Sequence, residues 1–169
     1  MLQSLLHGAE RGDPARGRAE AGRLRMQARE GRVRKKVVYA MDVAAMGMPG
    51  SRGRRVECYR LGNWVCMTGQ ASFRLDTGEM VGIGDPAGQA RQICDNVKAL
   101  MEMAGGSMAD VVKLTVYLTD RAHREVTYPI LRSYFGEPRP CQTGVIVKGL
   151  AREEMLIELD AWGFIDDPE

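Results

Sequence analysis

Cysteine and histidine, the residue types most often used for metal binding and nucleophilic catalysis, are few and widely spaced in this sequence. The cysteines form no C-x-x-C pair, and His7 is far from His123. The four cysteines are Cys58, Cys66, Cys94 and Cys141. We therefore predict neither a metal site nor a disulfide framework. Because the chain does not start with a charged and then apolar secretory leader, we expect reduced thiols and a cytoplasmic location.

Two carboxylates near the end of the chain lie in a segment with strand periodicity. Within residues 156–164, Glu158 and Asp160 alternate with Ile157 and Leu159, which places both acids on one face of a strand. A carboxylate on such a face can position water or transfer a proton. An ordinary solvated strand has the same pattern, so the alternation alone is compatible with either role.

The elements that position these groups are indicated by turn residues and apolar spacing. Strands are predicted at residues 36–40, 55–61 and 63–70, the last two joined in a hairpin at Gly62. Asp85 and Pro86 predict the start of a helix that ends at Gly105 and Gly106.

A second set of elements follows. Residues 110–118 predict a buried strand, and Thr119 and Asp120 predict the cap of a helix running to about Phe135. Pro129 is either inside this helix or in its first turn. Residues 142–147 and 156–164 predict two closing strands. We expect an α/β (α+β) domain at residues 35–169, in which two helices cover one face of a sheet and leave the other face to self-association.

Size and charge limit the possible classes of protein. The chain has 169 residues, 44% of them hydrophobic, which suits one domain. Its apolar runs are shorter than the ~20 residues of a membrane span, so we predict a soluble protein with no membrane partner. Residues 1–34 hold eight arginines and four acids, a net charge of +4 that leaves −2 on residues 35–169.

The arginine-rich leader, residues 1–34, has the composition of a disordered segment. It could be a basic arm for nucleic acid, an organellar transit peptide, or an extension without a role if Met26 is the true start. The third interpretation is favoured because the four acids weaken the other two.

Several segments, taken in order, resemble the Rid (YjgF) family. They are residues 61–70, 76–79, Gln92, Asn96, residues 104–107, 110–120, 134–136, 139–140 and 157–160. The resemblance implies a YjgF/chorismate-mutase-like fold and a homotrimer with ligand clefts between neighbouring subunits. In the best-known members these clefts hydrolyse enamine and imine acids to 2-keto acids and ammonia, without a metal or organic cofactor.

Hydrolysis of a 2-imino acid needs an anion clamp and a group that positions water. The family uses an arginine and a glutamate, and Glu158 matches the glutamate, so its implied role is catalytic. Gln142 stands where the arginine is expected, and Arg139 would lie on the opposite strand face. Charge-assisted bonds contribute about 1.5–3 kcal/mol each and neutral ones about 0.5–1.5. We therefore predict a substrate other than the usual 2-imino acids.

The resemblance also implies ligand contacts elsewhere. Thr68 and Gly69 match a Ser-Gly pair that could bind a ligand oxygen, although Gly69 could equally permit a bulge. Cys141 could line the cleft, and Tyr128 falls near a ligand-contact position, where packing is the alternative role. The family's tyrosine in the first loop has no counterpart, so the nearby arginines Arg52, Arg54 and Arg55 are candidate anion contacts.

Three functions remain open after the sequence alone. The first is hydrolysis of an enamine or imine unlike the usual 2-imino acids, by a homotrimer that binds a small molecule. The second is a non-catalytic ligand-binding trimer that has lost the arginine. RNA binding through the leader is the least favoured, because residues 35–169 are slightly acidic and show no basic-aromatic platform.

Overall fold

The computed structural model describes residues 35–44, 47 and 53–166, which form six strands and two α-helices. The strands are β1 (Lys35–Asp42), β2 (Arg54–Leu61), β3 (Trp64–Met67), β4 (Val111–Leu118), β5 (Cys141–Ile146) and β6 (Ile157–Phe164). The helices are α2 (Pro86–Met103) and α3 (His123–Tyr134), and a 3-10 turn, η1 (Met108–Asp110), precedes β4. The predicted leader and Arg52 lie outside the described residues.

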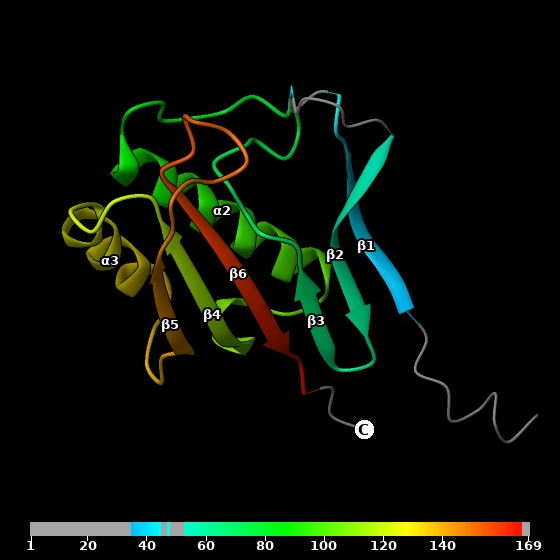
Figure 1. Cartoon of the computed structure of the whole chain (residues 1–169). Coiled ribbons are helices and arrows are strands. Elements are labelled where there is room, and N and C mark those ends of the chain that lie inside the picture. Colours follow the sequence, from blue (N-terminus) through cyan, green and yellow to red (C-terminus); the bar gives the residue numbers. More distant parts are fainter. Residues whose placement is uncertain (1–34, 45–46, 48–52, 167–169) are drawn as a thin grey trace, which may run out of the picture. The chain divides into compact units, whose positions relative to one another are not determined.

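All six strands belong to one sheet, in the order β1-β2-β3-β6-β4-β5. Neighbouring strands are antiparallel except β4 and β5, which are parallel and connected through α3. Both helices lie on the same face of the sheet (Figure 1). The predicted α+β fold, with a mixed sheet and two helices on one face, is confirmed.

Helix α2 forms where its local signals predict it. The Asp85 side chain accepts a hydrogen bond of 3.0 Å from the Ala87 N–H, which caps the first turn. At the other end Gly105 has a φ of +91°, the left-handed conformation that ends many helices. An apolar stripe at helical spacing packs on the sheet, and four of its residues have no exposed surface: Ala90, Ile93, Val97 and Leu100.

Helix α3 begins later than predicted. Asp120 accepts a 2.8 Å bond from the Ala122 N–H in a local turn, and Ala122 is the residue that precedes the helix. The prediction that Thr119 and Asp120 cap the helix was therefore wrong, because an Asp that closes its own turn resembles a helix cap in sequence. Pro129 lies inside the helix, which excludes it from the first turn.

The side chains of strand β6 alternate between the two faces of the sheet. Its residues Ile157, Leu159 and Ala161 have no exposed surface and contribute to the core against the helices. Glu158 and Asp160 alternate with them and point to the uncovered face, so the prediction that the two acids share one face is confirmed. We call this face, which no described helix covers, the open face.

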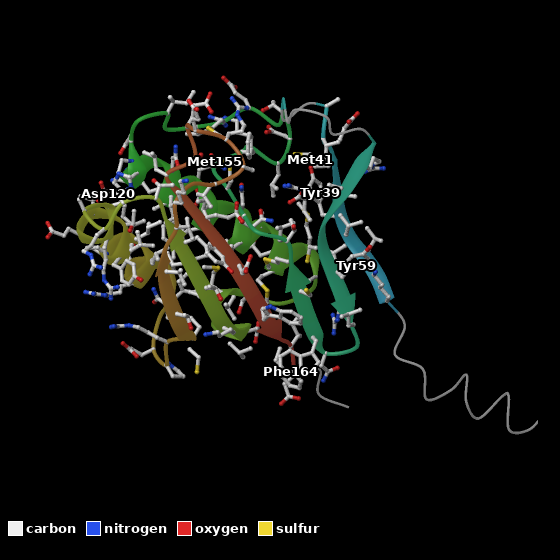
Figure 2. All side chains as sticks on the ribbon, in the orientation of Figure 1. Tyr39, Met41, Tyr59, Asp120, Met155 and Phe164 are labelled. Carbon is white, nitrogen blue, oxygen red and sulfur yellow. The ribbon has the colours of Figure 1, made fainter. Side chains whose placement is uncertain are left out.

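The open face carries an aromatic group at the end of β3 and β6, which we call the aromatic end. Its members Trp64, Trp162 and Phe164 are 47%, 41% and 37% exposed. The Trp64 and Phe164 rings meet edge to face with centroids 5.2 Å apart, and Phe164 lies at the lower end of β6 in Figure 2. The predicted self-association of this face stays a prediction. Among the described residues, none of the helices is long and apolar enough to cross a membrane.

Candidate functional site

Glu158 lies at the start of β6, half-buried on the open face and paired with Tyr117 of β4. Its carboxylate occupies the space beside Gly69, where a Cβ atom would overlap Oε1 of Glu158. Any other residue at position 69 would therefore displace this carboxylate. The glycine gives the acid a defined place in the fold.

The chain bulges where β3 ends at Met67. Cys66 pairs with Trp162 and Gln70 pairs with Leu159, so the β3 side contains one more residue than the β6 side. The bulge shortens β3 relative to the prediction. Gly69 thus lies in a bulge, as one of the two sequence interpretations held, and it also makes room for Glu158, while the predicted contact with a ligand oxygen stays a prediction.

Thr68 lies in the same bulge, next to Gly69. Its backbone N–H donates a 2.9 Å bond to the Glu57 carbonyl, so this donor is occupied. The Thr68 hydroxyl and the Gly69 N–H are the remaining groups that could contact a ligand oxygen beside Glu158.

The electrostatic surroundings of Glu158 favour proton transfer. Burial raises the pKa of the Glu158 carboxyl above its usual value, and the negative charge of Asp160 raises this pKa further. The positive charge of Arg55 acts in the opposite direction but does not cancel the shift. A carboxyl group whose pKa is closer to neutral can both accept and return a proton.

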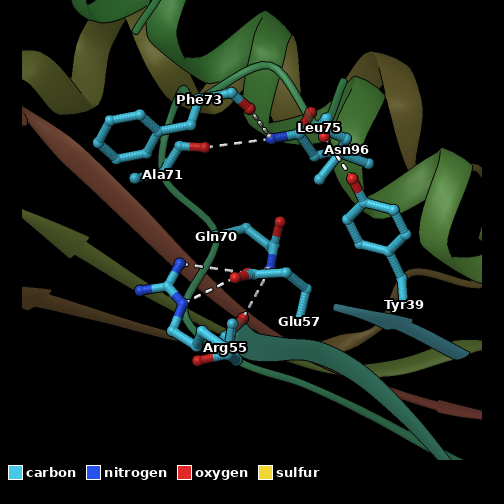
Figure 3. Close-up of polar contacts among 9 residues, drawn as sticks. Tyr39, Arg55, Glu57, Gln70, Ala71, Phe73, Leu75 and Asn96 are labelled. Atoms are coloured by element: carbon cyan, nitrogen blue, oxygen red, sulfur yellow. Dashed lines mark hydrogen bonds and ion pairs between the residues drawn. The ribbon is translucent and has the colours of Figure 1, made fainter. Parts of the chain in front are cut away.

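Arg55, whose positive charge acts on Glu158, is held by a buried carboxylate that was not predicted from the sequence. Glu57 is 2% exposed and accepts bonds of 2.7 and 3.2 Å from Nε and Nη2 of Arg55. Gln70 donates a third bond of 3.2 Å to Oε2 of Glu57 (Figure 3). The spacing of Arg55 and Glu57 by two strand residues could have indicated this pair, since it places them on one face.

A recess of about 10 Å³, enough for roughly one water molecule, lies at this cluster and is lined in part by Arg55, Glu57 and Gln70. Asn96 of α2 holds the opposite wall, because its amide donates bonds of 3.2 and 2.7 Å to the carbonyls of Ala71 and Phe73 (Figure 3). The chain after the bulge is thereby fixed to the helix layer, which keeps Gly69 in place beneath Glu158.

Gln142 and Glu158 lie on opposite faces of the sheet. In the parallel pair β4 and β5, Gln142 stands beside Leu114, which is buried toward the helices. Cys141 stands beside Lys113 and therefore points to the open face. Within one chain, β4 separates Gln142 from Glu158, so the structure does not bring these two predicted site residues together.

Tyr128 of α3 lies on the same side of β5 as Gln142. Its hydroxyl fills the space where a Cβ atom at Gly144 would stand. The Arg124 guanidinium lies over the Tyr128 ring, 4.2 Å from its centroid. The predicted site residues thus form two groups, one around Glu158 on the open face and one around Tyr128 and Gln142 at the sheet edge.

The remaining candidates have simpler surroundings. Arg139 forms an exposed ion pair with Glu137. All four cysteines are free, and burial raises the pKa of Cys58 and Cys94 to about 12, which keeps both thiols protonated. In the part of the chain that the structure describes, no group of His, Cys, Asp and Glu side chains could hold a metal ion.

Replacing Gly69 with alanine is expected to lower any activity of the Glu158 site at least tenfold, because the new methyl group displaces the carboxylate. The displaced atoms end a flexible side chain, so we expect the free energy of unfolding to change by about 1 kcal/mol or less. Urea denaturation and turnover are measured together. Gly149→Ala is the control, since no atom lies within 4 Å of its added Cβ. An active Gly69→Ala variant would contradict the role of this glycine.

Comparison with known proteins identifies relatives of this chain. Residues 47–164 match the family described as Endoribonuclease L-PSP. A RutC family protein of Pyrococcus horikoshii is 37% identical over 113 residues, which cover 67% of this chain and 88% of the relative. The 2-iminobutanoate/2-iminopropanoate deaminase of Escherichia coli K12 is 35% identical over 122 residues, covering 70% and 93%. The crystal structure of RidA from an Antarctic Psychrobacter species has a TM-score of 0.62 at 32% identity, and covers 71% of this chain and 95% of that one.

Proposed function

Because the chain belongs to the Endoribonuclease L-PSP family, which includes the Rid and YjgF proteins, we propose that it is a homotrimer that hydrolyses a reactive enamine or imine. The reaction releases ammonia and a carbonyl compound from a small metabolite bound between neighbouring subunits. The observation that carries this proposal is the half-buried Glu158 carboxylate, held beside Gly69 with a raised pKa.

The chemistry needs one group that accepts and returns a proton. Glu158 takes a proton from water as the water oxygen bonds to the imine carbon, and the C=N bond becomes a C–N single bond. The same carboxyl returns this proton to the nitrogen, which gives a neutral carbinolamine. It then takes the proton of the carbinol hydroxyl and delivers it to the nitrogen, so that the C–N bond breaks as the carbonyl forms and ammonia leaves. The sum is imine plus water to carbonyl plus ammonia, with no oxidation or reduction.

The arrangement of the two groups of site residues supports a site made by two subunits. Glu158 faces the open side of the sheet, whereas Gln142 and Tyr128 face the helix side at the edge strand β5. A cleft that contains both groups therefore needs residues from a second copy. The exposed aromatic end also supports association, since large exposed apolar patches mark interfaces.

The charges around Glu158 argue against a ligand with a carboxylate on the imine carbon. Gln142 is neutral, and the positive charge of Arg55 is offset by Glu57 at 2.7 Å. Glu158 and Asp160 are both acidic and repel an anion. Gln142 also favours the second candidate function, a trimer that binds a ligand without converting it.

Ammonia release from enzymatically generated 2-iminobutanoate and from its neutral amide tests the proposal. We expect the wild type to hydrolyse the amide faster than the acid, and Gln142→Arg to raise turnover of the acid at least tenfold through a charge-assisted clamp. Gln142→Glu is the matched control and should not hydrolyse the acid. Light scattering of each variant should give three times the 18.7 kDa chain mass.

Two results of this experiment would count against the proposal. Rapid wild-type turnover of 2-iminobutanoate would show that the site holds the acid without the arginine. No turnover of either compound by any variant, with an intact trimer, would favour the non-catalytic ligand-binding function. A monomer in solution would remove the two-subunit cleft altogether.

A further inference from the structure

The positively charged side chain of Arg124, in α3, lies over the side of β5 to which Gln142 points. Gln142 and Gly144 stand beside Leu114 and Val116 of β4, and both of these are buried toward the helices. Two residues of one strand that are two positions apart point to the same side, so Gln142 shares its side of β5 with Gly144. Nη1 of Arg124 is 3.5 Å from the place that a Cβ atom at Gly144 would occupy.

Because Gly144 has no side chain, Tyr128 of α3 can approach this side of β5 closely. The Tyr128 hydroxyl occupies the position of the absent Cβ, so even alanine at 144 would collide with it. Tyr128 is only 9% exposed, yet none of the described residues forms a hydrogen bond with its hydroxyl. The hydroxyl oxygen is not among the described polar atoms that are fully enclosed without a partner, so it keeps contact with solvent beside Arg124 and is available to donate to a ligand oxygen.

Arg124 has the geometry of an anion contact beside that hydroxyl. Its guanidinium is stacked on the Tyr128 ring at 4.2 Å, and among the described residues it forms no ion pair. Stacking restrains the long side chain, while the N–H groups at the edge of the guanidinium stay available to donate two hydrogen bonds to a carboxylate. Arg124 therefore combines a fixed position with an unused charge.

We propose that Arg124 and Tyr128 form the anion clamp of the cleft, and that the substrate carries its carboxylate away from the imine carbon. This inference rests on the proposed function for the identity of the reacting group. Gly144 is two strand residues from Gln142, a displacement of roughly 6.6 Å along the strand. An acid group held there does not coincide with the carboxylate of a 2-imino acid bound at position 142. The substrate class is an imine or enamine with a distal carboxylate.

Calorimetric binding of product-like keto acids to the intact protein tests the clamp without requiring turnover. The probes are 2-oxobutanoate, 4-oxopentanoate and 6-oxoheptanoate, together with the methyl ester of 6-oxoheptanoate. We expect one of the two longer acids to bind at least tenfold more tightly than 2-oxobutanoate, and the ester to bind at least tenfold more weakly than its acid. Arg124→Gln should remove the preference for acid over ester.

Two variants serve as references. Arg132→Gln changes an arginine in the last turn of the same helix and should keep the preference. Tyr128→Phe should weaken binding of the acid a few-fold, because only the hydroxyl is lost. Unchanged acid binding by Arg124→Gln would overturn the clamp, and tightest binding of 2-oxobutanoate would overturn the displaced carboxylate. Arg124-dependent binding without ammonia release would instead retain this inference and reject the proposed hydrolysis.

Discussion

Glu158→Gln is expected to lower ammonia release by about 10²–10⁴-fold, the usual contribution of a positioned acid or base. Glutamine keeps the shape and hydrogen-bonding reach of the side chain but cannot accept or return the proton. The rate is compared with that of Asp160→Asn, a matched change on the same face of β6. We expect Asp160→Asn to retain at least a tenth of the activity. Equal losses in the two variants would show that the charge of the face, not proton transfer by Glu158, supports the reaction.

The same variant has a predicted effect on stability with a definite sign. The native pKa of Glu158 is raised above its ordinary value of 4.5, so the folded chain holds this proton more tightly than the unfolded chain. The contribution to stability is complete below the unfolded pKa and is lost as the pH rises through the native pKa. Glu158→Gln should therefore unfold at higher urea than wild type at pH 7, and this gain should disappear near pH 4.

The gain in stability also separates the two possible roles of Glu158. A residue that has only a structural role would destabilise the fold when it is replaced. A variant that is more stable at neutral pH and inactive is the signature of a carboxylate held in an unfavourable place for its chemistry. Loss of the trimer in Glu158→Gln would show instead that this residue supports assembly.

Arg55→Ala is expected to have the largest effect on folding, about 3–5 kcal/mol in the free energy of unfolding. Glu57 is 2% exposed and loses its bidentate partner, while Gln70 remains as its hydrogen-bond donor. Since the Arg55 side chain is itself 33% exposed, water can partly replace it, and the lower end of this range is expected. Urea denaturation measures the loss.

The charge on Glu57 can be removed as a check. Adding Glu57→Gln to Arg55→Ala should restore much of the stability, because the buried group is then neutral. Arg54→Ala is the control: Arg54 is exposed and donates one bond of 2.7 Å to the Ala40 carbonyl, so its loss should cost about 1 kcal/mol or less. A loss in Arg55→Ala no larger than in Arg54→Ala would mean that Glu57 is adequately solvated without its partner.

Elements with local signals could be predicted from the sequence, and those that depend on pairing could not. The start and end of α2 followed from Asp85 and Gly105, whose side chain and φ act within a few residues. The start of α3 was misplaced because Asp120 accepts a hydrogen bond within its own turn, and only the folded structure distinguishes that turn from a helix cap. The early end of β3 depends on the pairing of Gln70 with Leu159, far away in sequence.

The candidate site shows the same division between features that local signals predict and features that depend on pairing. The face of Glu158 followed from alternation, but its place beside Gly69 depends on the bulge between two distant strands. Cys141 and Gln142 were both candidates for the cleft, and only their pairing with Lys113 and Leu114 shows that they occupy opposite faces of the sheet. The role of Arg124 needed the contact of α3 with Gly144, for which no spacing in the sequence is a signal.

The tryptophans of the aromatic end allow the solvent exposure of the open face to be followed by fluorescence. The chain contains two tryptophans, Trp64 and Trp162, and both lie on this face with 47% and 41% of their surface exposed. An indole in contact with water emits at longer wavelength than one in an apolar contact. The emission maximum of the intrinsic fluorescence therefore reports whether the open face is exposed to solvent or covered by another surface. The measurement needs no label and works at concentrations low enough to follow dissociation.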